Sequence, residues 1–327
     1  MSLRGRQAVI ESKNRHAARP AARSKSKFAE FAQACIQNRA LILMFIPGFA
    51  LFMLFHYVPM YGIIIAFKNF QLLNGIWASP WAGLDHFRRL FAGDDFNQAF
   101  YNTLMIAVLK LVFIFPAPII LAILLNEVRQ KKARRVIQTV SYLPHFFSWV
   151  ILGGILFTVL GTDGIVNQTL QALGMNRVDW MLDANKFYVV VLGSAIWQGV
   201  GWGSIIYFAA LSSIDPTLYE AAVVDGANRY RQIWHITLPS IMPTVIIMLL
   251  LYIGHFLSVG FDQIYNLTTP TNSARADILD TYVLRRLLSM DYELGAAAGI
   301  FTSVIGLFLV VAGNWLVKLY DREQGLW

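Results

Sequence analysis

The chain has 327 residues, of which 57% are hydrophobic and only 14% are charged, whereas a soluble domain usually carries about 25% charged residues. Its apolar residues come in blocks, and a single soluble core of this size could not bury them all. The composition therefore predicts an integral membrane protein surrounded by lipid, and the net charge of +8 does not make nucleic acid an expected partner. Cys35 is the only cysteine, which excludes an intrachain disulfide and a cysteine metal cluster.

Residues 1–39 are expected to form a basic cytoplasmic tail. The first 27 residues are rich in Arg, Lys, Ala and Ser, with Glu11 as their only acid, a pattern typical of disorder. Residues 28–36 place apolar side chains at helical spacing, which predicts a short amphipathic helix on the membrane face. The first apolar run is too long for a signal peptide, and an organelle transit peptide is the less favoured interpretation of this tail.

Six apolar segments within residues 40–327 are long enough to cross a bilayer, which takes about twenty mostly apolar residues. They are 40–66, 101–126, 140–160, 187–211, 240–261 and 296–317. The sequence therefore predicts an all-α membrane domain of six transmembrane helices, preceded by the basic tail.

The distribution of basic residues predicts the orientation of these helices. Residues 1–39 carry nine Lys or Arg residues and the loop 127–139 carries five. The three loops 67–100, 161–186 and 262–295 carry eight between them. Because basic residues favour the cytoplasm, both termini are expected inside.

The cytoplasmic loop after the fourth span predicts two short helices. Asp215 can cap free N–H groups, and Pro216 is tolerated in the first turn that follows. Gly226 can end this helix in the left-handed conformation. A second helix is expected over 228–235, with Pro239 stopping it before the fifth span.

This loop resembles the EAA signature of permeases in binding-protein-dependent ABC importers. The signature is Glu-Ala-Ala, three residues, Gly, nine residues, then Ile-x-Leu-Pro, and every position matches without a gap: Glu220, Ala221, Ala222, Gly226, Ile236, Leu238 and Pro239. The resemblance implies that these residues, together with Asp225, form a coupling helix that docks in a groove of an ATPase subunit. Gly226 would allow close backbone approach, and Glu220 would anchor the loop through charge-assisted hydrogen bonds. The alternative is an ordinary amphipathic connector.

The resemblance covers roughly residues 40–327. The segment 196–211 is similar to the span that precedes this loop in carbohydrate permeases. Residues 277–283, 295–300 and 325–327 resemble the oligosaccharide branch of the maltose-type permease superfamily, which includes importers of acidic oligosaccharides such as alginate. The resemblance implies a type I ABC importer permease fold, and it implies that the chain forms half of the translocation path for a sugar or oligosaccharide.

The resemblance also implies partners and a location. The partners are a second, non-identical permease, two ATPase subunits and an extracytoplasmic solute-binding protein, which would deliver sugar to the three outer loops. The location is the bacterial cytoplasmic (inner) membrane, crossed several times. The chain has no P-loop sequence, so we expect no enzyme activity and no cofactor in it, with ATP and Mg used by the ATPase partner.

Six residues are candidates for lining the substrate path: Lys110, Trp197, Gln198, Trp202, His255 and Asp262. Lys110 lies near the middle of the second span, where an unpaired lysine costs about 2.5–3.5 kcal/mol on insertion scales. It could contact substrate or a gate carboxylate such as Asp262, and pairing between helices is the alternative. The tryptophans and Gln198 offer a stacking face and an amide to a sugar, although membrane tryptophans are often anchors. His255 is expected to be buried and to need a partner, more often on another helix than in a ligand.

Other functions remain open at this stage. A secondary transporter should carry intramembrane carboxylates and inverted repeats, and the spans hold almost no acid. A membrane enzyme should cluster ionisable or metal-binding residues. An ABC permease for amino acids or phosphate would share the loop. Lys110, Arg285 and Arg286 are compatible with an anionic solute, but four acids share the third outer loop: Asp277, Asp280, Asp291 and Glu293.

Overall fold

The computed structural model describes residues 37–320, which are helical throughout apart from connecting segments and one isolated bridge between Lys68 and Trp81. The predicted amphipathic helix over 28–36, Cys35 and the segment 325–327 lie outside the described residues. The helices are α3 (Arg39–Phe52), the π-helical η2 (Met53–Tyr57), α4 (Val58–Met60), the 3-10 helix η3 (Tyr61–Phe67), α5 (Gly75–Ala78), α6 (Asp85–Ala92), α7 (Asp94–Phe113), α8 (Pro116–Glu127), α9 (Lys131–Tyr142), the 3-10 helix η4 (Leu143–Phe146), α10 (Trp149–Leu160), α11 (Ile165–Ala172), α12 (Phe187–Ser212), α13 (Pro216–Val224), α14 (Arg229–Gln232), the π-helical η5 (Ile233–Thr237), α15 (Leu238–Gly254), α16 (Phe261–Leu267), α17 (Ser273–Ala276), α18 (Leu279–Leu288) and α19 (Tyr292–Tyr320).

Six helices of the described chain are long and apolar enough to cross a membrane. They are Arg39–Phe67, Asp94–Glu127, Trp149–Ala172, Phe187–Ser212, Arg229–Gly254 and Tyr292–Lys318. Each overlaps one of the six predicted segments, so the all-α architecture and the number of spans are confirmed. Most of the apolar surface of these helices is not buried within the chain. Lipid or partner helices can therefore cover it.

The chain divides into two compact units, one ending at Tyr61 and the other beginning at Gly62. The described part of the first unit is α3, η2 and α4, in which no residue is buried. The predicted division between residues 39 and 40 falls at the edge of the described region and stays a prediction.

The predicted third span, 140–160, is interrupted. Its first residues belong to α9, which begins in the expected loop 127–139. Pro144 lies in a single 3-10 turn, Phe147 and Ser148 are extended, and α10 starts only at Trp149. The predicted span joined the end of the amphipathic α9 to the apolar α10 across this interruption.

Pro239 does not stop the helix before the fifth span, contrary to expectation. The helix runs from Arg229 to Gly254 through the π turn η5, in which the Leu238 N–H bonds the Ile233 carbonyl five residues back. Proline has no N–H, and its ring collides with the carbonyl four residues earlier, so the wider π turn accommodates it. The same device precedes Pro59, where the Val58 N–H bonds the Met53 carbonyl.

The fifth span also ends earlier than the predicted 240–261. Helix α15 stops at Gly254, residues 255–260 are not helical, and α16 begins at Phe261. Gly260 adopts a φ of +88°, in the left-handed region that favours glycine.

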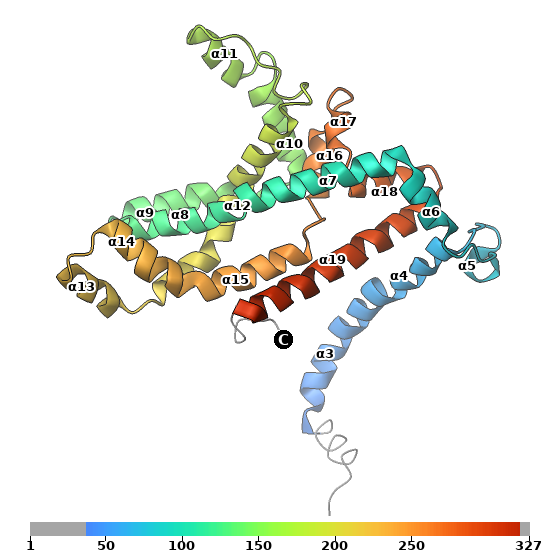
Figure 1. Ribbon diagram of the computed structural model, residues 1–327, viewed down its shortest axis with the longest axis horizontal. Coiled ribbons are helices and arrows are strands. Elements are labelled where there is room, and N and C mark those ends of the chain that lie inside the picture. Colours follow the sequence, from blue (N-terminus) through green and yellow to red (C-terminus); the bar gives the residue numbers. More distant parts are fainter. Residues whose placement is uncertain (1–36, 321–327) are drawn as a thin grey trace, which may run out of the picture. The chain divides into compact units, whose positions relative to one another are not determined.

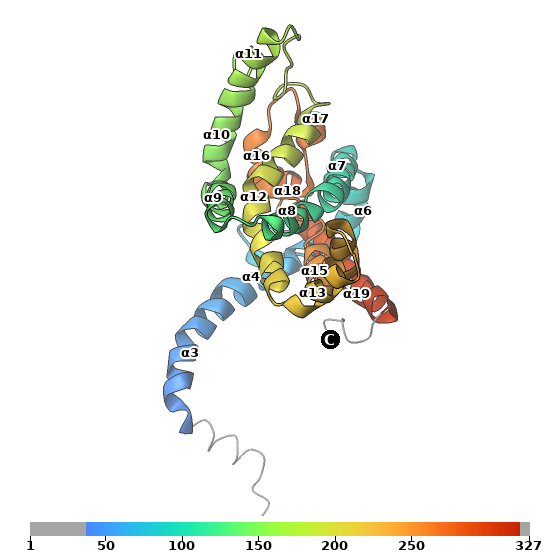
Figure 2. The same ribbon diagram turned by 90° about the vertical axis from the view of Figure 1, so that its left-hand side faces the viewer.

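Helix α12 lies at the centre of the second unit, where α8, α9 and α15 pack on it (Figures 1 and 2). The close approach of α8 and α9 to α12 depends on glycine residues of α12. A Cβ on Gly201 would lie 2.1 Å from the Ser141 carbonyl oxygen of α9, and one on Gly203 would lie 3.0 Å from the Pro118 ring of α8. The Gly201-x-Gly203 pattern therefore serves close helix packing, as small residues do between membrane helices.

The connections of the second unit alternate between its two ends, as membrane crossings require. At one end, on the left of Figure 1, the α8–α9 turn and the α13–α14 loop meet through an ion pair of 3.6 Å between Arg229 and Glu127. At the other end, the Phe70 N–H bonds Glu293 at 3.0 Å and the Asn102 amide bonds the Asp277 carbonyl at 2.8 Å.

Candidate functional site

The α13–α14 loop begins as its sequence predicts. Asp215 is the N-cap of α13, its carboxylate accepts the Thr217 N–H at 2.9 Å, and Pro216 occupies the first turn. This hydrogen bond favours the ionised carboxylate, so it lowers the pKa of Asp215 below its ordinary value.

Gly226 ends α13 in the expected left-handed conformation, with a φ of +74°. The Gly226 N–H bonds the Val223 carbonyl at 3.1 Å, and the Ala227 N–H bonds the Ala222 carbonyl at 2.8 Å. These two bonds form a Schellman motif, which satisfies carbonyls that the helix end leaves free. Asn228 then caps α14 by accepting the Arg231 N–H at 3.0 Å, so both helix boundaries of the loop follow from local chemistry.

The first half of the EAA motif is displayed at the surface. Glu220, Ala221, Asp225 and Gly226 are exposed, and only Ala222 is half-buried. Large apolar side chains accompany them, with Val224 88% exposed and Trp234 68% exposed. An exposed apolar patch beside charged side chains is typical of a protein contact surface.

The second half of the motif anchors the loop to the spans. Ile236 lies half-buried in η5, and Leu238 packs against the core formed by α8, α12 and α15. The Tyr219 hydroxyl lies 3.0 Å from the Thr237 hydroxyl. Because η5 continues into α15, this contact joins α13 to a membrane-spanning helix.

Lys110 joins three elements in the interior of the second unit, and its side chain is only 9% exposed. Its Nζ donates to the Val259 carbonyl at 2.6 Å and to Gln263 Oε1 at 2.7 Å. The Gln263 amide in turn donates to the Val191 carbonyl and to the Ser194 hydroxyl, both on α12, at 2.7 and 2.9 Å. Of the alternatives for Lys110, the structure shows pairing with another element.

Gly260 makes room for this ammonium. A Cβ on Gly260 would stand 3.3 Å from Lys110 Nζ. Lys110 therefore holds the non-helical segment 255–260 through the Val259 carbonyl. Position 260 needs glycine for its positive φ and for the space that the Lys110 ammonium occupies.

The other path candidates are dispersed. Trp202 is 47% exposed and stacks on His145 with ring centroids 4.7 Å apart, while Trp197 is 43% exposed and Gln198 is half-buried. Trp202 therefore offers a supported aromatic face. His145 is a residue that sequence reasoning did not single out, because its place beside α12 comes from the interruption of the third span.

The expectation for His255 is wrong. The residue is exposed, and its Nδ1 lies 3.3 Å from the Leu251 carbonyl of the preceding helix, α15. The reason is the early end of α15, which moves His255 out of the helix and to the mouth of two cavities. Asp262 is also exposed, at the start of α16, and the partners of Lys110 are Val259 and Gln263 rather than this carboxylate.

Two cavities of about 320 Å³ each flank the 255–260 segment. His255 and Ser258 line both. The first cavity adds Lys110 and Tyr252, and the second adds Thr302 and Ser303 from α19. The segment thus places polar groups where the hydropathy pattern predicted an apolar helix.

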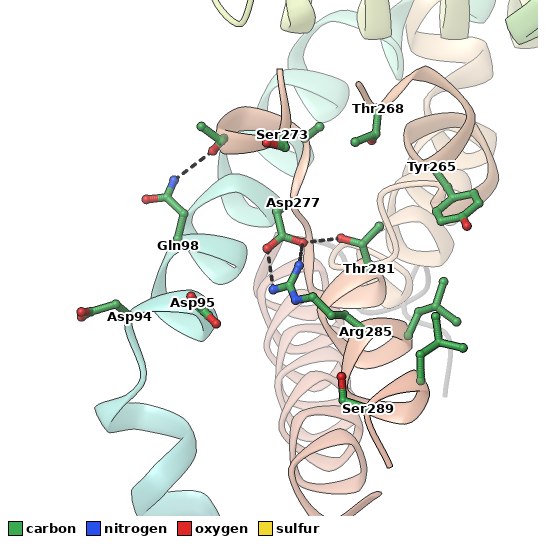
Figure 3. Close-up of a pocket in the computed structure, with 14 residues that line it drawn as sticks. Asp94, Asp95, Gln98, Tyr265, Thr268, Ser273, Asp277, Thr281, Arg285 and Ser289 are labelled. Atoms are coloured by element: carbon green, nitrogen blue, oxygen red, sulfur yellow. Dashed lines mark hydrogen bonds and ion pairs between the residues drawn. The ribbon is translucent and has the colours of Figure 1, made fainter. Parts of the chain in front are cut away.

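A larger pocket of about 1080 Å³ opens at the opposite end of the unit from the α13–α14 loop (Figure 3). Its charged lining residues are Asp94, Asp95, Asp277 and Arg285. Arg285 holds both carboxylate oxygens of Asp277, at 2.9 and 2.8 Å, and this bond raises the pKa of Arg285. Sequence reasoning named the outer loops 67–100 and 262–295, which supply this lining, but it did not single out Asp94, Asp95 or Tyr265.

Known proteins match this chain in sequence and indicate its family. The family of binding-protein-dependent transport system inner membrane components matches residues 114–325. Protein LplB of Bacillus subtilis is 43% identical over 88% of this chain and 91% of its own length. The polygalacturonan/rhamnogalacturonan transport system permease protein YteP of the same organism is 43% identical over 88% of this chain and 90% of its own length.

Solved structures agree with these sequence matches. A bacterial ABC transporter involved in the import of the acidic polysaccharide alginate contains a chain that is 39% identical, with a TM-score of 0.83 over 89% of this chain and 99% of that one. The alginate transporter in complex with an alginate pentasaccharide-bound periplasmic protein matches with a TM-score of 0.82. The chain therefore belongs to the family of binding-protein-dependent transport system inner membrane components, and it is a multi-pass membrane permease.

Proposed function

We propose that this chain is one permease subunit of an ATP-driven importer and forms half of the translocation path for an acidic oligosaccharide. The observation that carries the proposal is the capped, exposed α13 helix, which presents the first half of the EAA motif at one end of the bundle. The Tyr219 hydroxyl of α13 contacts the Thr237 hydroxyl of η5, and Arg229 of α14 pairs with Glu127 of α8. The substrate class is supported by the relatives, since one is a permease for polygalacturonan and rhamnogalacturonan and another belongs to an alginate importer.

The partners follow from the same family. A second permease would complete the path, two ATPase subunits would dock on the α13 side, and a solute-binding protein would dock on the side of the large pocket. The sequence has no P-loop, so ATP and Mg belong to the ATPase partner and this subunit acts as a transporter component rather than an enzyme. This arrangement puts both termini in the cytoplasm, consistent with the basic residues of the tail.

The coupling role belongs to the exposed half of the EAA motif. Glu220 and Asp225 offer carboxylates for charge-assisted hydrogen bonds, and Gly226 presents a surface without a side chain to the partner. Ile236, Leu238 and Pro239 hold the loop on the fifth span. Closure of the ATPase subunits would move α13 as a rigid body, a common form of switching.

The substrate-path assignment keeps the six residues named from the sequence: Lys110, Trp197, Gln198, Trp202, His255 and Asp262. The exposed ring of Trp202, supported by His145, suits the C–H face of a sugar. Gln198 and His255 offer hydrogen bonds to hydroxyls.

The test is reconstitution of this chain into proteoliposomes with its partner permease, ATPase and binding protein. We expect ATP-dependent uptake of an oligogalacturonate or oligoalginate, and ATP hydrolysis stimulated by the loaded binding protein. An ATPase variant unable to hydrolyse ATP is the control. Uptake driven by an ion gradient without ATP would replace the proposal with a secondary transporter, and stimulation by a non-sugar solute alone would replace the substrate class.

A further inference from the structure

Lys110 is an isolated charge in the interior of the bundle. In the part of the chain that the structure describes, α10, α12 and α15 carry no Asp, Glu, Lys or Arg. The second span, α7 and α8, carries other charged residues only in its terminal turns: Asp94, Asp95 and Glu127. Lys110 therefore sets the sign of the electrostatic potential in this part of the molecule.

Neutral groups alone hold the Lys110 ammonium. An ammonium has three N–H donors, and the structure shows two acceptors, the Val259 carbonyl and Gln263 Oε1. Both acceptors are uncharged, so they solvate the cation without neutralising it. A buried cation with uncharged partners favours any anion that can reach it, because the low local dielectric strengthens the attraction.

Two arginines near the outer end are paired with carboxylates, in contrast to Lys110. Arg285 donates two hydrogen bonds to the Asp277 carboxylate. Arg286 lies 3.5 Å from Asp95 and 3.8 Å from Asp291. An incoming anion would have to displace these carboxylates, whereas at Lys110 it would displace none.

The first cavity beside the 255–260 segment gives an anion access to Lys110. It has a volume of about 320 Å³, and Lys110, Tyr252, His255 and Ser258 are its polar lining residues. His255 and Ser258 are exposed, so the cavity opens to the surface of the bundle. A mainly apolar cavity with a few convergent polar groups is the usual form of a small-ligand site.

We propose that this cavity is a subsite for a uronate residue of the transported oligosaccharide, with the carboxylate on Lys110. Hydroxyl groups of the same sugar bond Tyr252, His255 and Ser258. The proposal rests on the proposed function and adds a mechanism of selectivity to it: the site attracts an acidic sugar, and a neutral sugar leaves the cation without a counter-charge.

The experiment measures equilibrium binding of trigalacturonate to the purified complete transporter without binding protein, by calorimetry, against the carboxyl-reduced neutral trisaccharide. We expect the wild-type protein to prefer the acidic ligand by about tenfold or more, as for a hydrogen bond to a charged group. Lys110→Arg should keep the preference, and Lys110→Met should abolish it. Tyr252→Phe is the matched control, since it removes a hydroxyl from the same cavity without changing charge, and it should weaken both ligands alike.

A second variant keeps the proposal testable if Lys110→Met does not fold. His255→Asp places a carboxylate at the exposed mouth of the cavity, where it competes for Lys110, and it should remove the preference for the acidic ligand. A preference that survives in Lys110→Met or His255→Asp would overturn the subsite, as would a wild-type protein without preference. ATP-dependent uptake in such a case would still support the importer, whereas loss of all ATP-dependent uptake by the wild type would refute the proposed function itself.

Discussion

Glycine residues shape this molecule by two separate physical effects. Gly226 is required by its backbone, because its φ of +74° lies in the left-handed region and no atom stands within 4 Å of a Cβ added there. Gly201 is required by its neighbour, because an added Cβ would lie 2.1 Å from the Ser141 carbonyl oxygen. Gly226 shapes the exposed surface of the α13–α14 loop, and Gly201 allows α9 to pack closely on α12. A substitution at Gly226 should therefore impair association with a partner, whereas one at Gly201 should lower stability.

Gly226→Asp is expected to leave the chain folded and inserted but to abolish its association with the ATPase subunit. Asp tolerates the left-handed conformation better than most residues, and its carboxylate would stand where the partner must approach. Co-purification from membranes measures the effect. Gly174→Asp is the matched control, since Gly174 has a φ of +77° and equally open surroundings. Equal loss of association in both variants would contradict a specific coupling role.

Gly201→Ala is expected to destabilise the protein by about 1–3 kcal/mol, the usual cost of overpacking, because α9 must move away from α12. Thermal unfolding of the purified protein in detergent measures the change. Gly199→Ala, in the same helix and with no atom within 4 Å of the added Cβ, should keep or raise the midpoint. The contact assignment would be wrong if both variants behaved alike.

At the scale of elements, the non-helical segment 255–260 is held in place by side chains from two other helices. Lys110 of α7 bonds its Val259 carbonyl, and Gln263, just after it, bonds both Lys110 and α12. A non-helical backbone that continues a membrane span needs such partners, because lipid offers none. The segment is therefore a helix interruption stabilised by side-chain hydrogen bonds, and two cavities flank it.

Gln263→Leu is expected to lower stability by about 1–3 kcal/mol, because it leaves buried partners unsatisfied. It removes one of the two acceptors of Lys110 and the donors to α12. Thermal unfolding again gives the measurement, with Gln168→Leu on the exposed side of α11 as the control. An unchanged midpoint for Gln263→Leu would mean that the break is held by other contacts.

At the scale of the whole molecule, the described loops of the second unit sort onto two ends. The α8–α9 turn shares one end with the α13–α14 loop through Arg229 and Glu127. The 161–186 segment shares the other end with the α16–α17 connection, where the Asn272 amide bonds the Met181 carbonyl at 3.1 Å. The proposed topology assigns the first end to the cytoplasm.

Cysteine labelling tests this assignment. In a Cys35→Ser background, Leu173→Cys should react with a membrane-impermeant maleimide in intact spheroplasts, and Val224→Cys should react only after permeabilisation. Both positions suit the test, because Leu173 is 72% exposed and Val224 is 88% exposed. The reverse pattern would invert the topology and move the α13 loop away from any cytoplasmic ATPase.

Local chemistry made much of this protein predictable from its sequence. Apolar segments of sufficient length located the six spans. The Asp215 cap and the Gly226 helix end depend only on residues within a few positions of each other, and both are confirmed. The EAA spacing indicated the family for the same reason, since it is a contiguous pattern.

Only the tertiary structure decided where the spans break and what their polar residues do. The predicted spans ran through the extended residues 147–148 and the non-helical residues 255–260. Pro239 stays inside a helix because of a π turn that composition does not signal. Lys110 finds its carbonyl partner 149 residues further along the chain, and Arg286 of α18 finds the Asp95 carboxylate on α7. The reason is physical: helix formation and capping are set by neighbours in sequence, whereas the pairing of a buried charge is set by neighbours in space.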